Sequence, residues 1–152
     1  MHTEIAVRFG LSEEAPHLKQ ALTHPSFANE QRGEADNQRL EFRGDAVLGL
    51  CASELLYERF PDADEGSLTR LRARLVNAEA LANWARDNDV AEALLLGRGA
   101  ESSGLRGSTN VLADAVEALV AATYLDAGLG AARKACEGIL VPQLEQMDAG
   151  ET

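Results

Sequence analysis

The stretch Asn37-Gln-Arg-Leu-Glu-Phe-Arg-Gly-Asp-Ala-Val-Leu-Gly-Leu50 places two carboxylates, Glu41 and Asp45, four residues apart in a segment with the pattern of a buried helix. In an α-helix, residues four apart lie on the same face. The next positions on that face are not polar, so we expect the pair to point toward protein rather than open water. Two half-buried like charges are unfavourable unless a cation offsets them. The stretch therefore predicts a helix with a cation-binding acidic face.

A second acidic pair lies in the most apolar segment of the chain, residues 111–125. Asp114 and Glu117 are the only charges there, and their spacing of three residues again puts both on one helix face. A helix that is apolar all round is a central one. We therefore expect this helix to meet the helix of Glu41 and Asp45, so that four carboxylates share one cavity.

Four carboxylates in one cavity suit Mg²⁺, with Mn²⁺ as a substitute, because these ions prefer oxygen ligands, whereas zinc and copper favour nitrogen or sulfur. Two such ions about 3.5–4 Å apart can activate a water and stabilise the leaving 3′ oxygen of a phosphodiester. The alternative is that the acids cap helices or pair with arginines such as Arg39, Arg43 and Arg72. Two pairs on the two most apolar helices favour the metal site.

Composition limits the class of protein. The 152 residues fit one domain, no apolar run is long enough to cross a bilayer, and the N-terminus lacks the apolar core of a signal peptide. Cys51 and Cys136 lie in helical patterns without a C-x-x-C spacing, so we expect buried free thiols and a reducing, cytoplasmic location. The net charge of −11 has the wrong sign for a typical nucleic-acid-binding protein.

Periodicity and helix-boundary signals predict an all-α, single-domain fold without strands. The predicted helix around Glu41 ends near Phe60, and the polar stretch 28–36 and the Gly/Ser-rich stretch 97–107 are predicted loops. The last helix, which starts at Ala131, is expected to stop near Leu140 because Pro142 follows. We therefore divide the chain into a domain of residues 1–142 and an acidic C-terminal tail of residues 143–152.

Four blocks of sequence carry a family resemblance. The pattern N-x-R-L-E-F-x-G-D-A-V-L, which begins at Asn37, resembles the signature of ribonuclease III, a metal-dependent nuclease that cuts double-stranded RNA. The stretches 21–27, 64–73 and 112–119 resemble other blocks of that family, and all four stand in the family's order. Ordered sets of motifs do not arise by chance matches, so the resemblance is specific.

The resemblance implies a homodimeric, Mg²⁺-dependent endoribonuclease that hydrolyses double-stranded RNA in RNA processing, with no organic cofactor and no membrane partner. It assigns the four metal-site acids to Glu41, Asp45, Asp114 and Glu117, and we take Asp45 and Glu117 as the catalytic pair within them. It also implies that Glu65 is a further acid of the cleft and that Phe42 plugs a socket in the partner subunit.

The chain departs from the family pattern at three positions: Gln38 replaces an acid, Arg43 replaces an apolar residue, and Asn110 lies in a stretch where relatives carry other polar residues. The double-stranded-RNA-binding domain that normally follows the nuclease domain is absent from the sequence, as in the short mini-ribonuclease relatives; an excised domain would also lack it. The candidate RNA contacts are the following arginines: Arg70, Arg72, Arg74, Arg98 and Arg106.

Two other functions fit parts of this sequence. One is a non-catalytic helical dimer that binds structured RNA or a ribonucleoprotein, although such a protein has no need to keep four buried acids. The other is an all-α nucleotide pyrophosphohydrolase, which also uses Mg²⁺ on helical acidic pairs. Its motif spacing differs, and it leaves the blocks at 21–27 and 64–73 unexplained.

Overall fold

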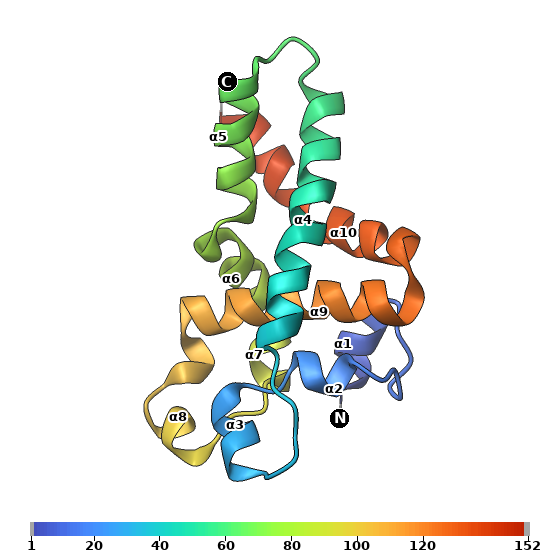
Figure 1. Ribbon diagram of the computed structural model, residues 1–152. Coiled ribbons are helices and arrows are strands. Elements are labelled where there is room, and N and C mark those ends of the chain that lie inside the picture. The colour runs from blue at the N-terminus through green and yellow to red at the C-terminus, as the bar shows by residue number, and fades with distance from the viewer. Residues whose placement is uncertain (1, 151–152) are drawn as a thin grey trace.

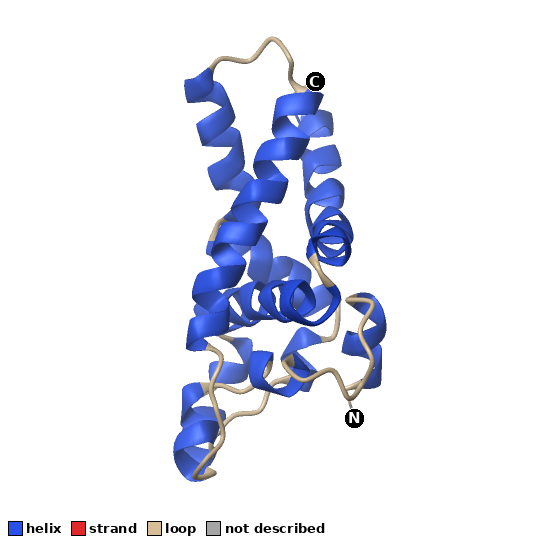
Figure 2. Cartoon of the chain, turned by 45° about the vertical axis from the view of Figure 1, so that its right-hand side comes forward, coloured by secondary structure: helices blue, strands red, loops and turns tan. Residues whose placement is uncertain are grey.

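The regular secondary structure is helical in the part of the chain that the computed structural model describes, residues 2–150. No strand occurs among these residues (Figure 2); the nearest approach to one is an isolated parallel bridge between Thr23 and Leu95. None of the described helices is long and apolar enough to cross a membrane. The prediction of an all-α fold is confirmed.

The helices follow one another with short connections. In chain order they are α1 (Thr3–Arg8), α2 (Leu18–Ala21), α3 (Pro25–Glu30), α4 (Gln38–Arg59), α5 (Glu65–Val76), α6 (Ala78–Asp87), α7 (Val90–Ala93), α8 (Arg98–Ser102), the 3₁₀ turn η1 (Leu105–Gly107), α9 (Thr109–Ala127) and α10 (Leu129–Gly150).

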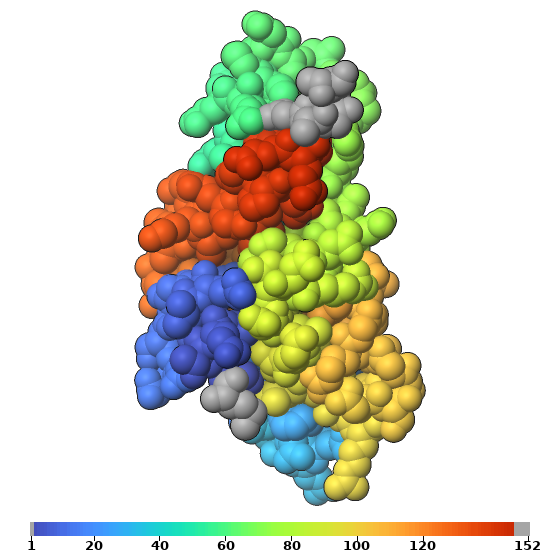
Figure 3. All heavy atoms as spheres, turned by 180° about the vertical axis from the view of Figure 1, so that it is seen from behind, coloured from blue at the N-terminus to red at the C-terminus, as the bar shows by residue number. Residues whose placement is uncertain are grey.

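Helix α9 is the centre of the fold, as its apolar sequence predicts. Its side chains are buried on almost every side, from Leu112 through Thr123. Helix α4 crosses it on one side, in the front of Figure 1. Helices α1, α6 and α10 close the opposite side, where they adjoin one another on the face that Figure 3 shows.

Two side chains directly before α4 fix the start of this helix. The Asp36 carboxylate accepts a hydrogen bond from the Gln38 amide at 3.0 Å, which satisfies one of the free donors at the helix start. The Asn37 side chain does not cap the helix but donates to the Ala21 carbonyl at 3.1 Å. These contacts tie the beginning of α4 to α2.

A close contact between backbones brings α4 against α9. Gly44 is buried on α4, and a Cβ atom built on it would overlap the carbonyl group of Glu117 on α9. Any side chain at this position would therefore push the two helices apart. Sequence reasoning did not identify Gly44, although a glycine inside a helix is unfavourable by roughly 0.5–1 kcal/mol and indicates a close approach.

Both predicted loops contain short helices, so those predictions are wrong in part. Residues Pro25–Glu30 form α3, which starts at a proline and is capped by the His24 ring, an acceptor for the Ser26 amide. The glycine-rich stretch contains α8 and η1. These turns are held by tertiary contacts, such as the 2.8 Å hydrogen bond from the Gly97 amide to Ser26 Oγ, which periodicity cannot reveal.

The predicted end of the last helix is also wrong, because α10 continues through Pro142 to Gly150. A proline inside a helix removes one backbone hydrogen bond at a cost of about 3 kcal/mol. Beyond it, Leu144 is buried and Met147 packs against the core. This apolar burial offsets the cost, so the predicted C-terminal tail starts as helix; residues 151 and 152 lie outside the described residues.

Replacing Gly44 by alanine should therefore destabilise the fold. We expect Gly44→Ala to lower the free energy of unfolding by about 2–3 kcal/mol, since the added methyl forces α4 away from α9. Gly49→Ala is the matched control on the same helix, because a Cβ there meets nothing within 4 Å. It should be neutral or stabilising by up to about 1 kcal/mol. Urea unfolding of both variants measures the difference, and equal stabilities would contradict the close contact.

Candidate metal centre

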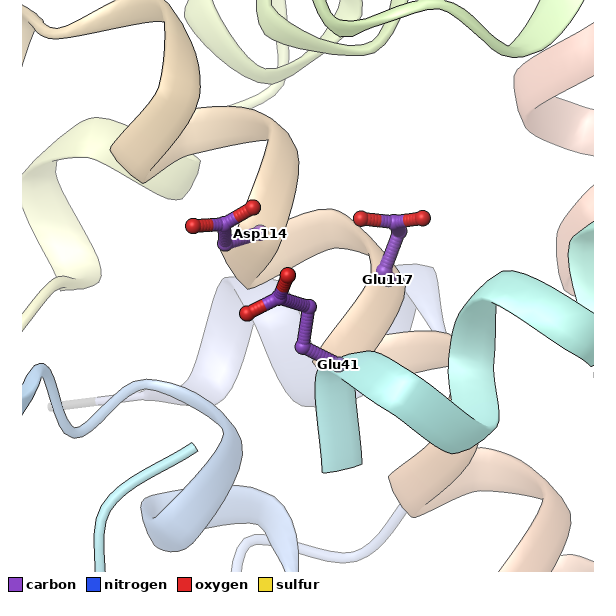
Figure 4. Close-up of side chains that lie close together, drawn as sticks. All are labelled: Glu41, Asp114 and Glu117. Atoms are coloured by element: carbon purple, nitrogen blue, oxygen red, sulfur yellow. The ribbon is translucent and has the colours of Figure 1, made fainter. Parts of the chain in front are cut away.

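Three carboxylates from two helices meet where α4 crosses α9 (Figure 4). Each of Glu41, Asp114 and Glu117 offers an oxygen atom, and these oxygens all lie within 4.8 Å of one another. All three side chains are half-buried. Glu41 comes from α4 and reaches toward the two acids of α9. The structure thus brings together, from residues 41 to 117, acids that are far apart in the sequence.

The four predicted acids form two hydrogen-bonded pairs, and each pair joins α4 to α9. Glu41 bonds to Asp114, and Glu117 bonds to Asp45. A hydrogen bond between two carboxyl groups requires a proton on one of them. These bonds raise the pKa of both glutamates, whereas the bond from Glu41 lowers that of Asp114, so a proton in the Glu41–Asp114 pair favours the glutamate.

Burial is the largest cause of the altered acidity of this cluster. It raises the pKa of Glu117 to about 9, with further contributions from the bond to Asp45 and from the charges of its three neighbours. It likewise raises the pKa of Glu41 to about 7, and the Asp114 and Asp45 charges add to it. The pKa of Asp114 is raised as well, again chiefly by burial. Crowded acids of this kind are strong ligands for a cation, which replaces the shared protons.

Asp45 differs from the other three acids. Its side chain is exposed, so the prediction that the whole cluster is buried is wrong at this position. The i, i+4 spacing does put Asp45 on the same face of α4 as Glu41. At Asp45, however, this face is open to solvent. The cluster is therefore a half-buried site with one acid on its open side.

His24 is a neighbour of the acidic cluster, beside Asp114. Its Nδ1 accepts a hydrogen bond from the Ser26 amide at 3.0 Å and lies 2.7 Å from Ser26 Oγ. Burial lowers the pKa of His24, and the nearby Asp114 charge opposes that shift. The ring thus packs beside the metal-site acids in its neutral form, with Nδ1 already committed to α3.

The structure does not bring Glu65 to this cluster within one chain. Glu65 lies in the first turn of α5, where it accepts a hydrogen bond from Thr69, and α5 begins beyond the far end of α4. It lines a hollow of about 410 Å³ between α4 and α5, together with apolar residues that include Leu56 and Leu68. Its role as a cleft acid stays a prediction.

Phe42 is not part of its own subunit's core. Its side chain is 83% exposed, although the neighbouring Leu40 is buried. Leu50 and Tyr57 on the same helix are exposed too, at 46% and 75%. Spacings of eight and seven residues put these three on one side of α4, so this helix presents an apolar strip to the outside.

The two substitutions beside Phe42 are accommodated at the surface. The Arg43 guanidinium lies over the Tyr124 ring, 5.0 Å from its centroid, which is a favourable cation–π geometry. Gln38 and Arg39 are exposed and, with Phe42, line a hollow of about 630 Å³. Arg43 therefore replaces an apolar residue without disturbing the core. The third substitution, Asn110, is exposed in the first turn of α9.

The predicted RNA-contacting arginines fall into two groups. Arg106 is a structural residue: it pairs with Glu101 at 2.8 Å and donates to the Ala91 and Leu94 carbonyls. This network holds η1 against α7 and leaves the guanidinium little freedom to bind RNA. The other four remain exposed, and they are Arg70, Arg72, Arg74 and Arg98.

This fold and this site define a class: an all-α protein with a half-buried cluster of carboxylates between two central helices. Comparison with known proteins then gives the family. A family model described as ribonuclease-III-like matches residues 15–144. The chain belongs to the ribonuclease III family.

Its curated relatives include ribonuclease 3 of Geobacter metallireducens, 49% identical over 138 residues, which are 89% of this chain and 56% of the relative. Ribonuclease 3 of Oleidesulfovibrio alaskensis is 53% identical over 118 residues, or 77% of this chain and 52% of the relative. The chain therefore spans about half the length of the curated relatives that it matches.

Among solved structures, the nuclease domain of ribonuclease III from Campylobacter jejuni superposes with a TM-score of 0.84 at 32% identity. The match covers 92% of this chain and 96% of that domain. That crystal structure is described as showing flexibility in the region involved in dimer formation. Fold and family thus agree with the resemblance that the sequence motifs carry.

The raised pKa values make the stability of the metal-free protein depend on pH. The pKa values of Glu41 and Glu117 are higher in the folded chain than their ordinary 4.5, at about 7 and about 9. The folded state therefore binds more protons between pH 4.5 and 9, and the free energy of unfolding falls as pH rises through this window.

We expect Glu117→Gln to flatten the upper part of this profile, from about pH 7 to pH 9, because the amide cannot lose the proton. Glu79→Gln, at an exposed glutamate of α6, is the matched control and should follow the parent. Thermal unfolding in EDTA across this range measures the effect. Parallel profiles for the parent and Glu117→Gln would show that Glu117 is ionised without metal.

Proposed function

We propose that this protein is a homodimeric, Mg²⁺-dependent endoribonuclease that hydrolyses phosphodiester bonds of double-stranded RNA. One observation carries the proposal: Glu41 of α4 meets Asp114 and Glu117 of α9 in a half-buried cluster whose oxygens suit a hard divalent cation, and Asp45 stands next to Glu117 on its open side. Family membership supports it, because the curated relatives are named ribonuclease 3. A ribonuclease III function also accounts for the sequence motifs that lie outside the acidic cluster.

The chain's own residues would divide the work as follows. Glu41, Asp114 and Glu117 would hold the cation from the buried side, and Asp45 would complete the set on the open side, where a phosphodiester can approach. Bound Mg²⁺ would supply an activated water and stabilisation of the leaving 3′ oxygen, in the two-metal manner. Asp45 and Glu117, which interact across the two helices, are the proposed catalytic pair.

A second copy of the chain would cover the apolar strip on α4. The exposed Phe42 ring needs a complementary socket, and the hollow between α4 and α5 offers Leu56, Tyr57 and Leu68 beside polar side chains, with the volume for a side chain. In a two-fold dimer each Phe42 would enter the partner's hollow, so the contact forms twice. Because Glu65 lines that hollow and Phe42 follows Glu41 in the chain, this arrangement would bring the partner subunit's Glu65 toward the metal site.

We further propose a single nuclease domain whose acidic C-terminal segment, predicted as residues 143–152, belongs to it, because Leu144 and Met147 pack against the core beyond the predicted boundary at residue 142. The free, buried thiols of Cys51 and Cys136 favour a reducing, cytoplasmic location. The proposed RNA contacts are the exposed arginines Arg70, Arg72, Arg74 and Arg98. The alternative, a dimer that binds structured RNA without cutting it, leaves the protonated acid cluster without a purpose.

Glu117→Gln should abolish cleavage of duplex RNA and leave the fold intact. The amide keeps the volume but removes one ligand charge, and the relief of acid crowding should preserve stability. We expect a rate at least about 100-fold lower in Mg²⁺, whereas Glu79→Gln should cut like the parent. The assay compares a perfect duplex with single-stranded RNA and with nucleoside triphosphates.

Each arm of this assay tests one reading. Hydrolysis of triphosphates alone would support a pyrophosphohydrolase instead, and duplex binding without any cleavage by the parent would support the non-catalytic dimer. Cleavage by Glu117→Gln at the parent's rate would overturn the proposed metal centre.

Phe42→Ala should break the dimer without unfolding the subunit. Truncation of a buried Phe costs about 3–5 kcal/mol, and a two-fold interface loses this contact twice, but the ring is exposed within one chain. Sedimentation should show a monomer at concentrations where the parent is a dimer, with a near-parental subunit fold by circular dichroism. Val7→Ala, at a side chain that is 73% exposed on α1, is the control and should stay dimeric.

A further inference from the structure

The chain has two cysteines, and the fold brings them together. Cys51 lies in the middle of α4 and Cys136 in α10, and both side chains are buried. The two thiols form a hydrogen bond with each other. The sequence predicted two buried free thiols without indicating that they meet. The packing of α10 on α4 brings them next to each other.

Contacts beside this pair of cysteines also join α4 to α10. One turn from each cysteine, Glu54 of α4 and Arg133 of α10 form a two-bond ion pair with distances of 2.9 and 3.1 Å. Beside them a crevice of about 160 Å³ is lined by residues of both helices. Cys51 borders this crevice, whereas Cys136 is not among its lining residues.

The two thiols are not equivalent. The hydrogen bond from Cys136 lowers the pKa of Cys51, and the Arg133 charge acts in the same direction, although burial and nearby acids oppose them. The same bond, together with burial, raises the pKa of Cys136. A thiolate is the nucleophilic form of cysteine. Cys51 is therefore both the more acidic sulfur and the one that borders the crevice.

We propose that Cys51 and Cys136 are a redox-active dithiol that hydrogen peroxide converts to a disulfide between α4 and α10. The Cys51 thiolate attacks one peroxide oxygen, so an S–O bond forms, the O–O bond breaks and hydroxide leaves. The Cys136 sulfur then attacks the sulfenic sulfur, an S–S bond forms, and the hydroxyl departs as water with the Cys136 proton. Two thiols and one peroxide thus give one disulfide and two waters, and a dithiol reductant reverses the change.

The bridge would act on stability rather than on the metal centre. Cys51 lies ten residues after Glu41 on α4 (Gln38–Arg59), which is about 15 Å along a helix. The bridge would close a long loop of chain, from residue 51 to residue 136, which restricts the unfolded state strongly. The inference depends on α4 and α10 alone, so it stands or fails independently of the proposed ribonuclease activity.

The test exposes the reduced full chain, in its native state, to hydrogen peroxide. Intact-mass and peptide analysis should show the loss of two hydrogen atoms and one cross-linked pair of peptides, those containing Cys51 and Cys136. The melting temperature should rise by more than about 5 °C and return after treatment with a dithiol reductant. Circular dichroism before oxidation confirms that the protein is folded when peroxide is added.

Two variants separate the roles of the sulfurs. In Cys136→Ser, Cys51 should stop at the sulfenic acid, which a cyclic diketone traps; in Cys51→Ser, Cys136 should stay reduced. Two free thiols after peroxide treatment of the folded parent would overturn the proposal, and so would disulfides formed only between chains. A bridge that lowers the melting temperature would show that the thiols do not meet in the native packing.

Discussion

The contact between the α4 backbone at Gly44 and the Glu117 carbonyl is the constraint on which the rest of the molecule depends. It lets a helix that carries Glu41 and Asp45 lie directly on a helix that carries Asp114 and Glu117. At an ordinary helix separation of 8–10 Å the side chains between the axes would keep these acids apart. Close approach of two backbones therefore creates both the centre of the fold and its acidic site.

In the metal-free protein, ionisation of all the acids at this site is electrostatically unfavourable. Burial raises the pKa of Glu41, Asp114 and Glu117, and the charges of neighbouring carboxylates raise the pKa of the two glutamates further. A proton held between two carboxyl groups turns their repulsion into a hydrogen bond. The raised pKa values also link cation binding to proton release, because the ligands must be deprotonated.

Helix α4 presents different sides to α9, to α10 and to the outside. Gly44 and the apolar residues near it face α9, Cys51 faces α10, and Phe42 with Tyr57 faces outward. A long helix with so wide an apolar surface has too much of it for one subunit to cover. The apolar pattern of residues 37–50 therefore predicted burial correctly for the side of α4 that faces α9. It was wrong for Asp45, which is exposed.

By itself the sequence determined the helices with strong periodicity, the central position of α9 and the four acids, because apolar spacing and like charges inside apolar helices leave few alternatives. The short helices α3 and α8 and the passage of α10 through Pro142 were beyond it, since contacts distant in sequence stabilise them. Tertiary structure alone decided that Glu65 lies apart from the cluster in one chain, that Arg106 is structural, and that the two thiols meet. The reason is physical: local pattern fixes which side of a helix is apolar, whereas the packing of whole helices fixes which residues on those sides touch.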